Sequence, residues 1–211
     1  MSSRRIGRYT LGARLYDVLS GERPVYRVGR SAAIGRLGLR PGDRVLDLGC
    51  GTGLNFAPVL AAIGPTGRLT GLDASGSMLA RARARTTAAG WDQVRLVEGD
   101  ATDLDTLVGE ATYDAVVATY TLSIMRDWQS VWVHALRRLR PGGRVAVVDL
   151  SLPGGLGLVW WPAARLACWT GGADPYRKPW RLAQDQLVDV ITTTHRAGHV
   201  VAVTGTRPGP A

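Results

Sequence analysis

From residue 44 onward, short apolar runs alternate with longer amphipathic runs, which predicts strands alternating with helices. The expected strands are 44–49, 68–75, 94–102, 113–123 and 144–150, and the expected helices are 55–63, 76–90 and 128–143. A helical pattern also runs from Leu11 to Leu37, with breaks near Gly21 and Pro24. Such an alternation favours a parallel sheet with helices on both faces, which binds ligands at the carboxyl ends of its strands.

The pattern changes toward residue 207. Two apolar-polar alternating runs, 188–196 and 199–207, are separated by a short turn at Ala197 and Gly198, which predicts an antiparallel hairpin that closes the sheet. We therefore expect an α/β fold with a doubly wound, mostly parallel, seven-stranded sheet and a C-terminal antiparallel hairpin. One domain would span 1–211, with a helical cap over 1–40.

Tryptophan is concentrated between the fifth strand and the hairpin. Four of the seven tryptophans lie in 153–180: Trp160, Trp161, Trp169 and Trp180. This segment could be a substrate-side insertion, either a lid over an amphiphilic acceptor or an interfacial helix with tryptophan at headgroup depth. A core helix with a covering loop explains the same residues equally well, because burying tryptophan requires no lipid.

The charge is positive and unevenly distributed. The chain of 211 residues carries a net charge of +9, and ten arginines lie in residues 1–44 against three acids. An anionic partner, such as a phospholipid surface, a phosphate-bearing substrate or nucleic acid, would be attracted to this segment. A solvated N-terminal helix is the simpler interpretation, and no nucleic-acid-binding module is visible, so no nucleic-acid partner is expected.

Other bulk features favour a cytoplasmic protein. Cys50 and Cys168 lie far apart and indicate no disulfide framework. The first ten residues lack the apolar core of a secretion signal, and no run of about eighteen apolar residues predicts a membrane span. Histidines, cysteines and acids show no metal-ligand spacing, so no metal is expected. His134, His195 and His199 are interpreted as structural.

The segment VLDLGCGTG carries glycine at 49, 51 and 53, between a strand and a helix. Such a turn lets a ligand approach the backbone closely. The third glycine comes one position earlier than in the dinucleotide pattern G-x-G-x-x-G. Asp47 lies within the strand, where its carboxylate would repel a diphosphate but could pair with an ammonium group, so the spacing favours a cationic ligand.

Two further acids follow neighbouring strands. Asp73 lies twenty residues beyond Gly53, where an acid can accept hydrogen bonds from ribose hydroxyls. Asp100 ends the next strand, where it could hold an adenine amino group. Each could instead cap the helix or turn that follows. Three acids at consecutive strand ends behind one glycine loop favour a shared ligand site.

These residues resemble the class I S-adenosylmethionine-dependent methyltransferases. VLDLGCGTG is similar to their motif I, GLDAS to the acid after it, EGDAT to the adenine-contacting segment, and LRPGGRVAVVDL to the segment entering strand five. The resemblance covers about residues 35–150. It implies a Rossmann-like methyltransferase fold with S-adenosyl-L-methionine as cofactor and S-adenosyl-L-homocysteine as product.

The resemblance also implies positions for the cofactor. Asp47 and the glycines would lie against the methionine part, Asp73 at the ribose, and Thr119 and Tyr120 at the sulfonium. The full implied set is Tyr16, Asp47, Gly49, Cys50, Gly51, Gly53, Asn55, Asp73, Ala74, Met78, Asp100, Ala101, Thr119 and Tyr120. Tyr16 lies in RLYDVLSG, similar to a segment of ubiquinone-type and phospholipid-type methyltransferases, although packing of the N-terminal helix explains it as well. Tyr16 and Tyr120 are the candidate catalytic residues; a base is needed only for a protonated acceptor.

The segment after the fourth strand indicates which class of methyl acceptor to expect. The Asn/Asp-Pro-Pro-aromatic motif of base-amino and glutamine methyltransferases is absent there. TYTLSIMRDW is similar to the YxLSxxPxW run of bacterial phosphatidylethanolamine N-methyltransferases, except around Arg126 and Asp127. A small or amphiphilic acceptor is expected, with a phospholipid amine first, a secondary metabolite or quinone next, and peripheral contact with the inner membrane surface. The oligomeric state is not addressed by the sequence.

Two alternatives stay open. One is a nicotinamide dehydrogenase. The displaced third glycine and the carboxylate of Asp47 argue against it. The other is a protein that uses S-adenosylmethionine without methylating, because a fold does not determine a function.

Overall fold

The computed structural model describes residues 26–153, 165, 174 and 176–209. Its strands are β1 Arg44–Leu48, β2 Arg68–Asp73, β3 Val94–Glu98, β4 Tyr113–Thr119, β5 Leu139–Leu150, β6 Val188–His195 and β7 Val200–Thr206. Its helices are α3 Arg27–Arg36, α4 Phe56–Ile63, α5 Gly76–Ala89, the 3-10 helix η2 Ala101–Asp103, α6 Leu104–Val108, α7 Trp128–Arg138 and α9 Trp180–Gln186.

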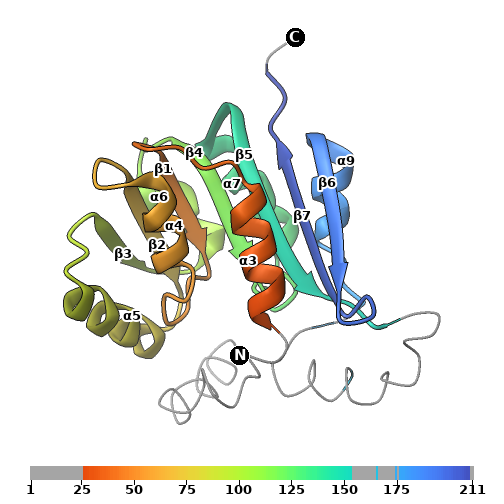
Figure 1. The fold of residues 1–211 in the computed structure, drawn as a ribbon, viewed down its shortest axis with the longest axis horizontal. Coiled ribbons are helices and arrows are strands. Elements are labelled where there is room, and N and C mark those ends of the chain that lie inside the picture. Colours follow the sequence, from red (N-terminus) through yellow and green to blue (C-terminus); the bar gives the residue numbers. More distant parts are fainter. Residues whose placement is uncertain (1–25, 154–164, 166–173, 175, 210–211) are drawn as a thin grey trace.

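The seven strands form one sheet in the order β3-β2-β1-β4-β5-β7-β6 (Figure 1). Strands β1 to β5 are parallel, and β7 runs antiparallel to both of its neighbours, β5 and β6. The expected fold class and the C-terminal hairpin are therefore confirmed. The chain order reverses between β1 and β4, which makes the carboxyl ends of these two strands the switch point where such sheets bind ligands.

Side chains alternate between the two faces of the sheet, and each face has its own core. On one face, Val45, Val117 and Val148 pack with apolar residues of α3, α4 and α5. On the other face, Leu46 and Val116 pack with α6, α7 and α9. Figure 1 shows α3 in front of the sheet, running roughly along the direction of β5. Two helical layers therefore cover the sheet, and α3 is built into the domain next to β5 and β7.

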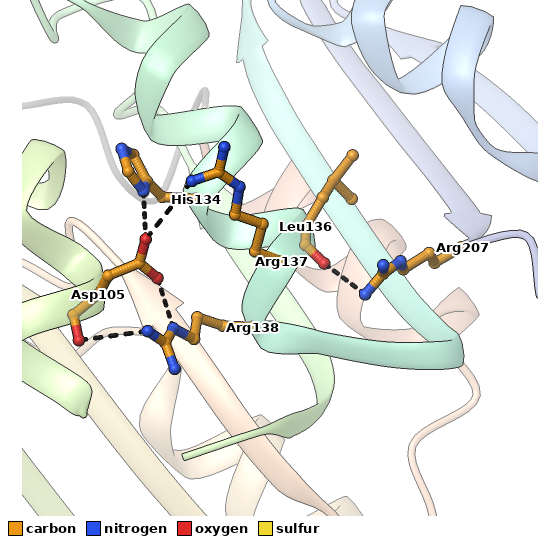
Figure 2. A network of polar contacts seen from close by, with 6 residues as sticks. All are labelled: Asp105, His134, Leu136, Arg137, Arg138 and Arg207. Atoms are coloured by element: carbon orange, nitrogen blue, oxygen red, sulfur yellow. Dashed lines mark hydrogen bonds and ion pairs between the residues drawn. The ribbon is translucent and has the colours of Figure 1, made fainter. Parts of the chain in front are cut away.

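The C-terminal half of helix α7 is fixed to α6 and to the segment after β7. The carboxylate of Asp105 on α6 accepts hydrogen bonds from His134 Nδ1 at 2.7 Å and Arg138 Nε at 2.5 Å (Figure 2). Arg207, just after β7, donates to the carbonyls of Leu136 at 2.7 Å and of Leu139, groups that the end of a helix leaves without partners. His134 is thus a packing residue of this cluster, as expected.

Several expected boundaries are wrong. The helix expected over 128–143 ends at Arg138, because Leu139 is already extended and pairs with Tyr113 at a bulge of the sheet. The fourth strand ends at Thr119, because Tyr120 adopts a left-handed conformation (φ 58°). The third strand ends at Glu98, ahead of the turn into η2. Helices α6 and α9 were not expected.

The N-terminal helical cap is described only from Tyr26, where it forms α3. Most of the Trp-rich segment 153–180 and all of residues 1–25 lie outside the described residues. In the part of the chain that the structure describes, no helix combines the length and apolar character needed to cross a bilayer.

Candidate functional site

The glycine loop connects β1 to α4 at the switch point. Gly49, Gly51 and Gly53 all have positive φ, between 55° and 80°, which side chains other than glycine rarely adopt. A Cβ on Gly49 would lie 1.9 Å from Thr121 Oγ1, whereas a Cβ on Gly51 would meet no heavy atom within 4 Å. Gly49 is thus required for close packing of the loop on the segment after β4, and Gly51 leaves open space for a ligand.

Asp47 lies beneath this loop and is fully buried. Its Oδ1 accepts a hydrogen bond from Asn55 Nδ2 at 2.7 Å, and its Oδ2 has no hydrogen-bond partner among the described groups. Burial raises the pKa of Asp47 from 3.8 to about 7; the bond from Asn55 and the charge of Arg30 act in the opposite direction. A buried carboxylate oxygen without a donor is costly, and it indicates a cationic partner.

Asn55 and Thr119 connect Asp47 to helix α3. Asn55 is buried at the N-terminus of α4 and Thr119 is buried at the end of β4. Arg30 Nη1 donates to Asn55 Oδ1 at 2.7 Å and to Thr119 Oγ1 at 2.9 Å. Asn55 Nδ2 also approaches Thr119 Oγ1 at 3.1 Å. The predicted residues Asp47, Asn55 and Thr119 therefore lie in one polar cluster, together with an arginine that was not predicted.

Tyr120 anchors the start of α3. Its hydroxyl donates to the Tyr26 carbonyl at 2.7 Å, its ring centroid lies 4.9 Å from that of Tyr26, and Arg30 lies 5.7 Å above its ring. This distance is within the range of a cation–π contact. The phenol proton of this candidate catalytic residue is thus used in a structural hydrogen bond. Tyr16, the other candidate, lies outside the described residues.

Asp73 at the end of β2 fixes the loop from the neighbouring strand. Its Oδ2 accepts from Gly51 N at 2.8 Å and its Oδ1 from Ser75 N at 2.9 Å. Burial raises the pKa of Asp73, and the hydrogen bonds from the two backbone nitrogens lower it by less. The cap of α5 is Ser75, whose hydroxyl accepts from Met78 N, so Asp73 is not itself the capping residue. Each carboxylate oxygen keeps a second lone pair for a ligand hydroxyl.

The remaining predicted residues lie along the same edge. Asp100 is exposed and caps η2, accepting from Thr102 N at 3.0 Å and Thr102 Oγ1 at 2.9 Å. Ala101 and Met78 are buried, and Ala74 is exposed. The carboxyl ends of β3, β2, β1 and β4 are neighbours in the sheet, so these positions follow one another along it. The adenine role of Asp100 stays a prediction.

Cys50 faces away from the ligand side. Its side chain is buried in the core with Phe56, next to Gly71 of β2, and burial raises the pKa of its thiol. The thiol is therefore unsuited to act as a nucleophile. Only the backbone of Cys50 is placed to line the loop.

A second buried acid fixes the segment after β4. Asp149, fully buried at the end of β5, accepts from Ser123 N at 2.9 Å, Ser123 Oγ at 2.6 Å and Leu150 N at 2.8 Å. Burial raises the pKa of Asp149 to about 6, although the three hydrogen bonds act to lower it. Both carboxylate oxygens of Asp149 accept hydrogen bonds within the protein. Asp149 therefore positions Ser123 and needs no ligand to satisfy it.

Sequence reasoning missed Arg30, Tyr26, Asp149 and Ser123. Arg30 is one of ten arginines in the N-terminal fifth, and only the docking of α3 on β5 and β7 distinguishes it from the others. His199 is buried, and its Nδ1 lies 2.7 Å from the Ser151 carbonyl, in keeping with a structural role. In the ranges that the structure describes, no three histidines, cysteines or acids are grouped as metal ligands.

The arrangement is suited to a ligand with a cationic group. The loop offers open backbone at Gly51, Asp47 offers a carboxylate oxygen without a donor, and Asp73 borders the same loop. Asp47 is fully buried, and a low-dielectric setting strengthens its attraction for a cation.

Comparison with known proteins bears on this chemistry. The family model described as "Methyltransferase domain" matches residues 46–145. A demethylmenaquinone methyltransferase of Staphylococcus aureus (strain JH9) is 34% identical over 140 residues, which are 66% of this chain and 56% of that protein. The chain thus spans little more than half the length of the curated relatives it matches.

Solved structures share the fold at lower identity. An O-methyltransferase family protein from Burkholderia thailandensis superposes with a TM-score of 0.69 and 19% identity, over 97% of this chain and 63% of the other. The phosphoethanolamine N-methyltransferase 2 of Haemonchus contortus, in complex with S-adenosyl-L-methionine, gives a TM-score of 0.66 and 16% identity, over 85% and 52%.

Proposed function

We propose that this chain, whose residues 46–145 match the methyltransferase domain family, is a class I methyltransferase that transfers a methyl group from S-adenosyl-L-methionine to a small or amphiphilic acceptor. The observation that carries the proposal is the unpaired Oδ2 of buried Asp47 beneath a glycine loop that is open at Gly51. A diphosphate cofactor would be repelled there, whereas an α-ammonium group would satisfy the carboxylate.

The residues of the site fit each part of this cofactor. Asp47 would accept a hydrogen bond from the ammonium group, the backbone around Gly51 would border the chain that carries it, and Asp73 would accept from the ribose hydroxyls. Asp100 would hold the adenine amino group, and Thr119 and Tyr120 would face the sulfonium. When bound, S-adenosyl-L-methionine supplies a methyl group that its positive sulfur has already activated.

The protein's task in such a reaction is mainly alignment and exclusion of water. Asn55, Thr119 and Asp149 hold the loop and the segment after β4 through buried hydrogen bonds, so the reacting groups would meet a preformed surface. The hydroxyl of Tyr120 is committed to the Tyr26 carbonyl. This favours an acceptor that is already deprotonated, or one that loses its proton after transfer.

Two acceptor classes follow from the similarities. The staphylococcal relative is named for a quinone, and the Haemonchus structure for phosphoethanolamine. Both are consistent with an amphiphilic or headgroup-like acceptor, such as a quinone or a phospholipid amine. With such an acceptor, we propose a cytoplasmic enzyme that contacts the inner membrane surface peripherally.

The test uses methyl-labelled S-adenosyl-L-methionine incubated with the protein and a bacterial lipid extract, followed by partition between organic and aqueous phases. Label in the organic phase with stoichiometric S-adenosyl-L-homocysteine supports an amphiphilic acceptor, and label in the aqueous phase redirects the search to polar metabolites. Release of methylthioadenosine without transferred label would overturn methyl transfer in favour of other chemistry. Tight binding of NADH would favour the dehydrogenase alternative.

A further inference from the structure

The sheet ends at β6, an edge strand that pairs only with β7 in the part of the chain that the structure describes (Figure 1). We propose that two copies of this chain dimerise through this edge, with their β6 strands antiparallel about a twofold axis at Thr193. The sheets of the two protomers would then join into one continuous sheet. Such a dimer does not depend on which cofactor or acceptor the protein uses.

The outer edge of β6 lacks the features that usually keep an edge strand from pairing with another chain. Native edges are commonly protected by charged side chains, especially lysine, by proline, or by being short. Strand β6 has eight residues, most of them β-branched, and it contains no lysine, arginine or proline. The opposite edge strand, β3, has five residues and carries exposed Arg95 and Glu98. Of the two edges, β6 is therefore the one suited to strand addition.

A bulge limits the regular part of this edge to 191–195. The register with β7 shifts between Val188 and Ile191, and Asp189 within the shifted part has a left-handed backbone (φ 52°). From Ile191 to His195, each residue has one partner on β7 and the register is constant. A partner strand can therefore form a regular ladder with 191–195 but not with the residues before them.

Hydrogen bonds at the two ends of β7 show which of its residues face β5. Ser151 N donates to the His199 carbonyl at 2.8 Å, and Arg207 N donates to the Gly143 carbonyl at 2.7 Å. Both bonds connect β7 to the chain of β5, and the register between them is constant from Arg144 to Leu150. Bonding direction alternates along a strand, so the odd-numbered residues of β7 face β5 and the even-numbered residues face β6.

Thr192 and Thr194 consequently have backbone groups that point away from β7. The residues of β6 that lie opposite the even-numbered residues of β7 are Ile191, Thr193 and His195, so these three bond to β7. The N–H and C=O groups of the two residues between them face outward by the same alternation. Each β6 strand thus offers two donors and two acceptors to a further strand.

These outward groups determine the register of the proposed dimer. Outward-facing residues must lie opposite one another to exchange hydrogen bonds in an antiparallel pair. An axis at Thr193 places Thr192 opposite the partner's Thr194, and both lie within 191–195. An axis at Thr192 would instead pair Thr194 with Val190 in the bulge, and an axis at Thr194 would pair Thr192 with Arg196 in the turn. Only the axis at Thr193 uses both outward residues within the regular part.

The side chains of one sheet face would gain apolar contact in this register. Thr192 accepts a hydrogen bond from Gln184 Nε2 of α9 at 2.9 Å, so Ile191, Thr193 and His195 lie on the opposite face. Ile191 is 50% exposed. In the dimer it would lie opposite the partner's His195 and diagonal to the partner's Thr193, and such cross-strand pairs stabilise a sheet.

The charges of β6 favour an antiparallel second copy over other occupants. The strand has an acid near its start, Asp189, and a base directly after its end, Arg196, and both are exposed. Antiparallel pairing brings Asp189 of each copy beside the partner's Arg196, whereas parallel pairing would bring Asp189 beside its own copy. Opposite charges across strands stabilise the pairing and like charges oppose it.

Sedimentation velocity of the full chain between about 1 and 100 μM measures the association, since this range brackets the dissociation constants of moderate complexes. We expect a species of twice the chain mass that dissociates on dilution. Thr193→Lys places two ammonium groups opposite each other on the axis, and it should raise the dissociation constant of the dimer by about tenfold or more. Thr87→Lys, on the exposed end of α5, is the matched control and should leave it unchanged. Thermal unfolding checks that both variants fold.

Cysteine cross-linking tests the register without adding charge. Thr193 and its copy would form a pair without mutual hydrogen bonds, with Cα atoms about 4.5 Å apart, which a disulfide can bridge. Copies of Thr192, or of Thr194, would be offset by two residues and lie about 9 Å apart, beyond the reach of a disulfide. Mild oxidation should therefore cross-link Thr193→Cys and leave Thr192→Cys and Thr194→Cys at the background of the unmodified chain, which contains Cys50 and Cys168.

Three results would overturn the proposed dimer. The first is a chain that stays monomeric up to about 100 μM, which would leave the edge of β6 to another occupant. The second is a dimer that Thr193→Lys does not weaken, because its interface would lie elsewhere. The third is cross-linking of Thr192→Cys or Thr194→Cys in preference to Thr193→Cys, which would contradict the register. The proposed methyl transfer would stand after any of the three.

Discussion

At the scale of single residues, the site depends on one carboxylate whose ionisation is resisted by burial. The pKa of Asp47 is about 7 without a ligand, and an adjacent ammonium group would lower it. Binding of a cationic ligand below pH 7 therefore requires Asp47 to release a proton. It follows that cofactor affinity should fall as the pH drops below about 7.

We expect the affinity for S-adenosyl-L-homocysteine to fall by up to about tenfold per pH unit between roughly pH 7 and pH 5, because one proton is released on binding. In Asp47→Asn this pH dependence should be lost, and the affinity at pH 8 should be lower by about 10- to 100-fold. Calorimetric titration at several pH values measures both effects. The same slope in Asp47→Asn would show that another group titrates.

Asp47 also sets a pH dependence of stability in the ligand-free protein. Its pKa is 3.8 as a free side chain and about 7 in the folded chain, so the folded state binds more protons between these values. Stability should therefore decrease as the pH rises through this window. Urea unfolding should show Asp47→Asn to be more stable than the unmodified chain at pH 8, with the difference disappearing near pH 4.

Two glycines of the loop should respond differently to the same substitution. Gly49→Ala places a Cβ 1.9 Å from Thr121 Oγ1 and 2.7 Å from Thr121 Cβ, so rotation of the Thr121 side chain cannot relieve the overlap. Gly51→Ala meets only the left-handed backbone penalty, about 1–2 kcal/mol. Gly51→Ala should fold with that loss and bind S-adenosyl-L-homocysteine weakly, whereas Gly49→Ala should be destabilised considerably more. Equal urea midpoints for the two variants would contradict this placement of Thr121.

At the scale of elements, the segment after β4 is connected to the end of β5 by Ser123 and Asp149. Two of the three donors to Asp149 belong to Ser123, so this pair determines where residues 120–123 lie relative to the sheet. The contact is fully buried, and a lost hydrogen bond to a charged group is expensive in such a setting.

Ser123→Ala should lower the free energy of unfolding by about 1.5–3 kcal/mol at pH 8, where Asp149 is ionised. The loss should diminish as the pH falls below about 6, because the protonated acid depends less on a hydroxyl donor. Urea unfolding at pH 8 and pH 5 measures the difference. Ser130→Ala is a suitable control, since the described hydrogen bond of Ser130 uses only its backbone nitrogen.

The elements also show which features a sequence can predict. Asp47, the three glycines and Asp73 were predicted because strand ends and loop spacing are local properties. Arg30 was not, because its role depends on how α3 packs against β5 and β7. Asp149 and Ser123 meet only through the register of β4 and β5, and the boundary at Leu139 depends on pairing with Tyr113. Local spacing thus indicated the candidate ligand site, and tertiary packing determined the residues that support it.

At the scale of the whole molecule, the excess of positive charge should govern any contact with a membrane. Ten arginines lie in residues 1–44, and the net charge of the chain is +9. If the acceptor is a phospholipid amine or a quinone held in the bilayer, an anionic surface should attract the enzyme.

We expect the protein to co-sediment with phosphatidylglycerol vesicles at low salt and to be released at about 0.5 M salt, where charges are screened within a few ångströms. Phosphatidylcholine vesicles are the matched neutral control. Absence of binding to anionic vesicles at low salt would contradict the membrane contact and favour an acceptor that is free in water.

The position of β7 has a consequence for how the chain is made. β7 leaves the ribosome after β6 and yet lies between β5 and β6, so neither β5 nor β6 has its final partner until residues 200–206 have been synthesised. During that interval β1 to β5 can already form a parallel sheet, but the apolar edge of β5 over Arg144–Leu150 is exposed. Unpaired edges of this kind recruit strands from other chains. A ribosome that pauses between β6 and β7 should therefore yield aggregation-prone nascent chains, which would depend on chaperones more than chains in which synthesis proceeds without a pause.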